Sequence, residues 1–144
     1  MANLSNYSLF VYGSLLSGFK SPAYDYISSY FDLVSKGKVK GILYDMGDYP
    51  AAVPGGTSDQ IIEGELYRIK NEGEFSWAIA QLDEYEGVMV EANQKPLYRR
   101  ETVEIMLPGG TTETAWIYWY NGDVAGRPLI ESGNLLEYIN RLRG

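Results

Sequence analysis

The residue best suited to proton chemistry is Glu86, at the end of a segment with helical periodicity. At 100° per residue, Glu86 falls at about 20° from Phe75 and near Leu82 at about −20°, within the apolar stripe of the predicted helix. An inward carboxylate at the negative end of a helix dipole is disfavoured in its ionised form. Both effects are expected to raise the pKa of Glu86 toward the range in which a carboxylate can take up and return a proton at neutral pH.

A structural role is the alternative for Glu86, as a buried carboxylate paired with a cation. Three cations that follow it in the chain could supply the partner: Lys95, Arg99 and Arg100. The same helical count places Asp83 near 80° and Glu84 near 180°. Asp83 is therefore predicted at the rim of the apolar stripe and Glu84 in solvent, where both are interpreted as solubilising charges.

A second candidate is the turn formed by Tyr12, Gly13, Ser14 and Leu15, which follows a predicted buried strand. Gly13 permits a backbone turn that directs successive N–H groups into one concavity, where they can bind a carboxylate or an oxyanion. Gly13 and Gly18 match neither the dinucleotide fingerprint nor the phosphate-loop pattern. The turn is interpreted either as an anion site or as a purely structural feature.

A third candidate is the alternating aromatic run near the end of the chain. Trp116, Tyr118 and Tyr120 share one face of a predicted strand. This face could line a pocket, or it could pack into the core, where each buried tyrosine hydroxyl needs a partner.

Composition excludes several classes of chemistry. The 144 residues include no Cys and no His, which excludes Ser-His-Asp and Cys-His nucleophiles and any histidine-ligated metal. With 12 Lys and Arg against 19 Asp and Glu, the formal net charge is −7, the wrong sign for a nucleic-acid surface. Proton chemistry in this chain must use Asp, Glu, Lys or Tyr.

The chain is predicted to form one domain over residues 1–144. It shows no leader pattern and no apolar run of membrane-spanning length, so we expect a cytoplasmic protein that does not enter a membrane. The absence of Cys agrees with a reducing compartment.

Periodicity and turn residues predict the elements that position these side chains. We expect strands over 7–12, 38–44, 61–69, 98–107 and 114–120, the last two joined by a turn over 108–111. Helices are expected from Ser21-Pro22 to Gly37, over 72–85 with Gly87 as its cap, and around 135–142. Gly64 suggests a bulge or a close backbone approach. The Gly- and Pro-rich segment that starts at Gly47 is expected to be a long loop.

The fold class is α+β, a mixed, mostly antiparallel sheet or small barrel with flanking helices.

Six segments carry a family resemblance: LFVYGSL at 9–15, GILYDMGDYPA at 41–51, GELY at 64–67, LDEYEG at 82–87, YRR at 98–100 and WIY at 116–118. In this order and spacing, the chain resembles the short, AIG2-like form of the gamma-glutamylcyclotransferase family, which includes gamma-glutamylamine cyclotransferases. The resemblance implies a small barrel with flanking helices.

The resemblance also implies an activity, in which a gamma-glutamyl amine or peptide is cyclised to 5-oxoproline with release of the amine. The family's catalytic glutamate corresponds to Glu86. Tyr12, Gly13, Ser14 and Leu15 correspond to the segment whose backbone amides hold the glutamyl α-carboxylate. Tyr49 and Tyr118 are the further substrate-binding residues that we expect.

This reaction needs neither Cys nor His, because the α-amine of the substrate is the nucleophile and ring closure supplies proximity. Glu86 would act as general base and then as general acid, without metal or cofactor. The expected partner is a small gamma-glutamyl substrate. A homodimer stays open, because exposed Tyr and Trp side chains would suit a subunit interface as well as a ligand.

Two other classes of function stay open at this stage. One is a non-catalytic protein that binds a small carboxylate or amine in the same cavity. The other is a metal enzyme with carboxylate ligands, for which Asp45, Asp48 and Asp83 are the candidates.

Overall fold

The computed structural model describes residues 7–13, 22–47, 50–55, 59–86 and 98–142, with the backbone alone for 22–24 and 84–86. The elements follow one another as β1 (Ser8–Val11), α1 (Pro22–Tyr30), β2 (Phe31–Asp45), β3 (Pro50–Pro54), β4 (Ile61–Ile69), a 3-10 turn (Glu72–Glu74), α2 (Phe75–Glu86), β5 (Tyr98–Met106), β6 (Thr112–Tyr120) and α3 (Leu135–Leu142). No helix in these ranges is long and apolar enough to cross a bilayer.

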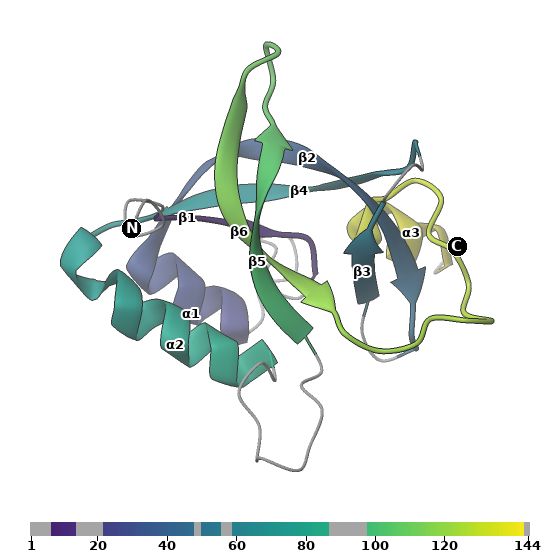
Figure 1. Ribbon diagram of the computed structural model, residues 1–144, viewed down its shortest axis with the longest axis horizontal. Coiled ribbons are helices and arrows are strands. Elements are labelled where there is room, and N and C mark those ends of the chain that lie inside the picture. Colours follow the sequence, from purple (N-terminus) through teal and green to yellow (C-terminus); the bar gives the residue numbers. More distant parts are fainter. Residues whose placement is uncertain (1–6, 14–21, 48–49, 56–58, 87–97, 143–144) are drawn as a thin grey trace.

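Five of the described strands form a closed barrel in the order β2-β4-β1-β6-β5, and a pairing of Lys38 with Met106 joins β2 to β5. The β1–β6 pair is parallel, whereas the other pairs are antiparallel. β3 adds to the free edge of β2. This arrangement confirms the predicted mixed, mostly antiparallel barrel with flanking helices (Figure 1).

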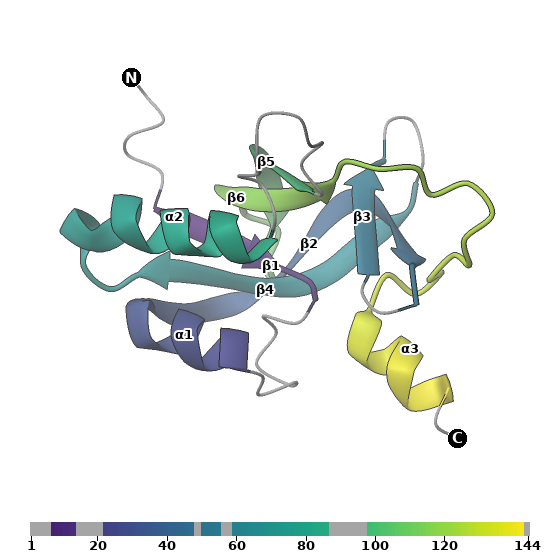
Figure 2. The same ribbon diagram turned by 90° about the horizontal axis from the view of Figure 1, so that it is seen from below.

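Alternation along the strands separates two hydrophobic clusters. Phe10, Leu66 and Ile117 belong to a cluster that fills the barrel. Leu9, Tyr67 and other residues on the outer faces of the same strands form a second cluster with residues of α1 and α2. Figure 2 shows the two helices beside each other at one end of the molecule, with α3 at the other end. Apolar side chains of α2 from Phe75 to Leu82 thereby pack against the outer faces of the strands.

Two glycine predictions are explained by the structure. A Cβ on Gly64 would lie 2.1 Å from the Val11 carbonyl oxygen and 2.7 Å from the Phe10 ring, which confirms the close backbone approach. In the β5–β6 hairpin, Gly109 and Gly110 have φ values of 90° and 89°, which favour glycine. The predicted turn over 108–111 is confirmed.

The helix predicted from Ser21-Pro22 is present as α1, but its predicted end is wrong, and one segment predicted to be a loop contains a strand. The helix expected to reach Gly37 ends at Tyr30, because Phe31 begins β2 and pairs with Ile69 of β4. The adjacent apolar residues Leu33 and Val34 interrupt strict alternation, and the β2–β4 register shifts between Leu33 and Ser35.

The segment expected to be a loop after Gly47 contains β3. Its prolines, Pro50 and Pro54, occupy the two ends of the strand. β3 pairs with β2 alone, and an edge strand tolerates proline at such positions.

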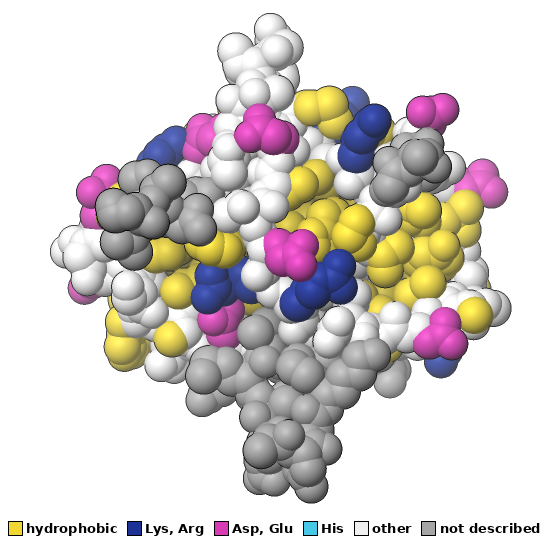
Figure 3. Space-filling model, in the orientation of Figure 1, with side chains coloured by type: hydrophobic (Ala, Val, Ile, Leu, Met, Phe, Trp, Pro, Cys, Tyr) yellow, Lys and Arg dark blue, Asp and Glu magenta, His cyan; other side chains and the backbone are white. Residues whose placement is uncertain are grey.

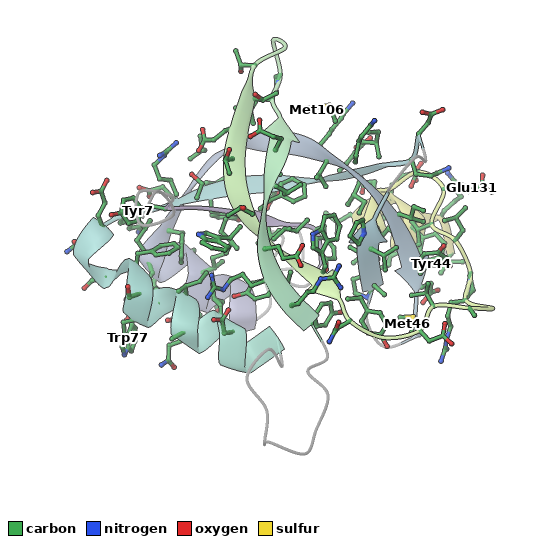
Figure 4. All side chains as sticks on the ribbon, viewed as in Figure 1. Tyr7, Tyr44, Met46, Trp77, Met106 and Glu131 are labelled. Carbon is green, nitrogen blue, oxygen red and sulfur yellow. The ribbon has the colours of Figure 1, made fainter. Side chains whose placement is uncertain are left out.

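Charges of both signs are scattered over the face shown in Figure 3, and hydrophobic side chains gather toward the β3 end. Tyr44 and Met46 lie at that end, whereas Trp77 lies on the outer side of α2 (Figure 4). Trp77 is 53% exposed, and its ring is tilted by 55° against that of Tyr30, with the ring centroids 5.3 Å apart.

Candidate active site

The last turns of α2 carry a buried carboxylate that the sequence did not predict. Asp83 is only 5% exposed, and its Oδ1 accepts hydrogen bonds from Arg100 Nε at 2.7 Å and from the Tyr118 hydroxyl at 2.8 Å. Its Oδ2 accepts a third from Arg100 Nη2 at 3.0 Å. The prediction that Asp83 is a solvated rim residue is therefore wrong, because β5 and β6 cover this side of the helix.

Arg100 supplies the cation for this end of α2. The last turn of the helix contains no basic residue. Arg100, from β5, is therefore the cation near the negative end of the helix dipole. The guanidinium also lies over the Trp116 ring, 4.6 Å from the centroid. Arg99, on the opposite face of β5, pairs instead with Glu101 at 2.7 Å.

Tyr12 connects this group to the turn that follows β1. Its ring is buried inside the barrel, and its hydroxyl donates to the Tyr118 carbonyl oxygen. The chain of contacts from Asp83 through Tyr118 to Tyr12 places the last turns of α2 near the start of the turn.

Gly13 brings a further element to the same region. It does not have a positive φ, so its role is close approach: a Cβ at Gly13 would lie 3.1 Å from Pro50 Cγ. The Tyr98 hydroxyl donates to the Pro50 carbonyl oxygen at 2.7 Å, and the Tyr98 and Tyr120 rings meet edge to face. The end of β1 and the starts of β3 and β5 therefore meet beside β6.

Glu65 is a second buried carboxylate that the sequence reasoning did not select. It is 9% exposed, lies opposite Val11 in the β1–β4 ladder and accepts a hydrogen bond from the Tyr67 hydroxyl at 3.1 Å. Strand alternation could have indicated this position, because Glu65 shares a face of β4 with Tyr67 and Ile69. It is adjacent to the start of the predicted anion-binding turn.

Several predicted site residues lie outside the described part of the chain. Ser14, Leu15 and Tyr49 are in this group, and so is the side chain of Glu86, whose backbone ends α2. Tyr118 lies in the outer cluster with Tyr120, where Trp116 packs against them, so the predicted shared face is confirmed.

The structure shows which carboxylates bind the two arginines that were considered as partners for Glu86. Arg100 is bound by Asp83 and Arg99 by Glu101, so each arginine has another carboxylate as its partner. Lys95 lies outside the described residues.

Two of the three candidate metal ligands, Asp45 and Asp83, are engaged by other groups. Asp83 binds Arg100 and Tyr118, whereas Asp45 accepts from the Gly47 N–H at 2.8 Å and from the Tyr138 hydroxyl at 2.8 Å. The pKa of Tyr138 is raised because its hydroxyl hydrogen-bonds to Asp45. Asp48 lies outside the described ranges. Within those ranges, no three acidic side chains are grouped as metal ligands would be.

A cavity of about 380 Å³ opens on the outer side of β2 and β4. Glu65 borders it, together with Lys36, Lys38 and Glu63, and Leu107 and Asn134 close two of its sides. The Asn134 side chain donates to Glu63 at 3.2 Å. Neither Asp83 nor Tyr118 lines this cavity, so it lies apart from the Asp83 contacts.

Comparison with known proteins gives the family. The sequence profile described as gamma-glutamyl cyclotransferase, AIG2-like, matches residues 9–137. The chain belongs to this family. A gamma-glutamylcyclotransferase family protein, YtfP, from Citrobacter rodentium is 37% identical over 95 residues, which cover 66% of this chain and 67% of the relative.

Solved structures of similar proteins share the fold. The solution structure of YtfP from Escherichia coli is 31% identical, with a TM-score of 0.62 over 92% of this chain and 98% of that one. An AIG2-like protein from Mus musculus is 20% identical, with a TM-score of 0.63 over 88% and 86% of the two chains. The family segments at 9–15, 64–67, 82–87, 98–100 and 116–118 all contribute residues to the region built above.

Proposed function

We propose that this family member is a gamma-glutamyl cyclotransferase that converts a gamma-glutamyl amine or peptide to 5-oxoproline and a free amine. Family membership over residues 9–137 supports the reaction class. The structural observation that supports the site is the contact chain from Asp83 in α2 through Tyr118 to Tyr12. It links the helix that ends at Glu86 to the turn proposed to bind the substrate.

In this proposal the backbone N–H groups of the 12–15 turn hold the α-carboxylate of the substrate. Glu86 removes a proton from the α-ammonium group, and the resulting amine attacks the γ-carbonyl carbon. A new C–N bond closes the five-membered ring, and the bond to the departing nitrogen breaks as Glu86 returns the proton to it. The ring nitrogen loses its second proton to solvent, and the released amine takes one up from solvent. Tyr118 and Tyr49 are proposed to line the substrate site. No metal or cofactor takes part.

The test uses a panel of gamma-glutamyl amines and gamma-glutamyl amino acids, with 5-oxoproline measured by chromatography. We expect Glu86→Gln to lose about a hundred- to ten-thousand-fold in kcat, the range of general acid–base catalysis, while the circular dichroism spectrum stays unchanged. Glu74→Gln is the matched control, because Glu74 is an exposed carboxylate just before the same helix. It should leave kcat unchanged.

Other outcomes separate the alternatives. Saturable binding of a gamma-glutamyl compound without formation of 5-oxoproline would favour a non-catalytic protein that binds a small carboxylate or amine at the proposed substrate site. Full activity in Glu86→Gln would contradict the assignment of the base. We expect activity to persist in a chelator, and its loss there would reopen the carboxylate-metal alternative.

A further inference from the structure

The cavity outside β2 and β4 is bordered by two rows of opposite charge. In the β2–β4 ladder Lys36 is opposite Glu65 and Lys38 is opposite Glu63, so these four side chains share one face of the strand pair. All four border the cavity of about 380 Å³. Directly opposed residues of antiparallel strands have Cβ atoms about 4.5–5.5 Å apart, so a positive row along β2 runs close beside a negative row along β4.

The two rows do not neutralise each other by direct contact. Lys36 and Lys38 are exposed, and among the described residues neither forms an ion pair. Glu63 is half-buried, and its Oε1 accepts from the Asn134 side chain at 3.2 Å, which orients the carboxylate. The lysine charges therefore stay available to a molecule that enters the cavity, beside a carboxylate that is already held in place.

Apolar side chains close the sides of the cavity. Met106, Leu107 and Pro108 contribute from the end of β5 and the turn that follows it, and Leu136 contributes from α3. Figure 4 shows Met106 at the end of β5. The volume lies at the small end of the range of ligand sites, about 300–1,000 Å³. The space suits a small molecule with an aliphatic part.

The cavity is separate from the proposed substrate site. Of the described residues of that site, Tyr12, Gly13 and Tyr118 are not among those that line the cavity. Glu65 is the cavity residue nearest to them in the sheet, since it lies opposite Val11 in the β1–β4 ladder.

The paired rows select for a ligand that carries both charges. A simple anion bound by the lysines would also face the carboxylates of β4, and a simple cation bound by Glu63 would face the lysines of β2. Like charges placed together oppose binding, whereas complementary charges favour it. A zwitterion laid across the two strands meets the opposite charge at each end.

We propose that this cavity is a second binding site, which takes a free α-amino acid with an aliphatic side chain. The carboxylate of the ligand lies at the ammonium groups of Lys36 and Lys38, and its own ammonium group lies at Glu63, where Glu65 adds to the negative potential. The aliphatic side chain packs between Met106 and the other apolar walls. The inference goes beyond the proposed function and does not rest on it.

The test is an NMR titration of the full chain, followed by 1H–15N correlation spectra, with three probes of the same branched skeleton. L-Leucine carries both charges, 4-methylpentanoate lacks the ammonium group, and 3-methylbutylamine lacks the carboxylate. We expect L-leucine to bind about tenfold more tightly than either analogue, because each analogue loses a hydrogen bond to a charged group. Equal binding of an analogue, or no saturable binding of L-leucine, would overturn the proposal.

Variants of the two rows locate the contacts. Glu63→Gln should weaken L-leucine binding about tenfold, and Lys38→Ala about threefold, because the exposed lysine is screened by solvent. Lys40→Ala is the matched control, since Lys40 is the next exposed lysine on this face of β2 but lies opposite Ile61 and outside the cavity lining. It should leave the affinity unchanged. Equal losses in Lys38→Ala and Lys40→Ala would mean a general effect of charge and contradict the site.

The position of the shifted amide signals separates this site from the substrate site, since an amino acid is also a product when the substrate is a gamma-glutamyl amino acid. L-Leucine should shift the signals of residues 36–38, 63–65 and 106–107. Shifts confined to residues 12, 13 and 118 would place the ligand in the proposed substrate site and overturn the inference. If the expected shifts occur but no 5-oxoproline forms from any substrate, the proposed function fails and the second site stands. If Glu63→Gln does not fold, the comparison of Lys38→Ala with Lys40→Ala decides.

Discussion

Two clusters of a carboxylate, an arginine and a hydroxyl lie on opposite faces of β6. The Asp83 cluster contains Arg100 and Tyr118, and the Glu113 cluster contains Arg68 and Ser8. In the first, the carboxylate and arginine side chains are 7% and 23% exposed, and in the second they are 25% and 51% exposed. The chemistry is the same, but the access of water differs.

The clusters also connect different parts of the fold. Glu113, Arg68 and Ser8 come from β6, β4 and β1, which are already joined by ladder hydrogen bonds. In the Asp83 cluster, Arg100 and Tyr118 are opposite each other in the β5–β6 ladder, but Asp83 comes from α2, which shares no ladder with these strands. A polar contact therefore contributes most to stability where it is the specific link between a helix and the sheet. The contribution is also large where loss of one partner leaves a charge that water cannot fully solvate.

The largest expected loss of stability follows from removing the Asp83 carboxylate. Asp83→Ala leaves the Arg100 charge without its carboxylate, and we expect a loss of about 3 kcal/mol in the free energy of unfolding, the low end for a broken buried pair because Arg100 retains some exposure. Urea denaturation measures this loss. A loss no larger than that of Glu113→Ala would show that exposure does not distinguish the clusters.

Removing the hydroxyl of the same cluster should have a smaller effect. Tyr118→Phe keeps the ring in the outer core but removes one hydrogen bond to an ionised carboxylate, worth about 1.5 kcal/mol. The same urea titration applies, with Ser8→Ala as the counterpart in the Glu113 cluster. Additive losses in Asp83→Ala combined with Tyr118→Phe would contradict a direct coupling of the two residues.

Breaking the more exposed Arg68–Glu113 pair should lower the free energy of unfolding by a still smaller amount. Glu113→Ala removes the partner of Arg68, whose side chain is half exposed and can be solvated in its place. We expect a loss of about 1 kcal/mol or less in the free energy of unfolding. A loss of about 3 kcal/mol would mean that the Glu113 cluster is as desolvated as the other.

The smallest expected effect is a difference between the two clusters in how salt changes their contribution to stability. The Debye length falls from about 10 Å at 0.1 M to about 3 Å at 1 M, which screens exposed pairs most. The stability difference between wild type and Glu113→Ala should therefore shrink by a few tenths of a kcal/mol in 1 M salt, whereas the difference for Asp83→Ala should persist. Urea titrations at both salt concentrations give these differences, and equal shrinkage would contradict the contrast.

The sequence predicted the elements whose signals are local. β4 was predicted from 61 to 69, as observed, and the hairpin glycines and α2 also agree, because alternation, turn residues and a long apolar stripe are properties of a few neighbouring residues. The helix expected beyond Tyr30 failed because pairing of Phe31 with Ile69, distant in the chain, overrides local periodicity.

The candidate site, like the fold, was predicted from the sequence only in part. Motif order and helical phase selected Glu86, Tyr118 and the turn that begins at Tyr12. They assigned Asp83 to the rim, since a helical wheel gives the direction of a side chain and not what lies opposite it. Glu65 was missed because both faces of its strand are covered in the folded barrel.

By itself, the sequence determined the inventory of the chemistry: carboxylates and tyrosines without Cys or His, and the family segments in their order. Only the tertiary structure decided which carboxylate Arg100 binds and which acid is removed from water. Periodicity along a chain specifies the face that a residue occupies, but partners such as Asp83, Arg100 and Tyr118 come from three separate elements. The β5–β6 ladder sets Arg100 opposite Tyr118, and the packing of α2 against these strands brings Asp83 to both.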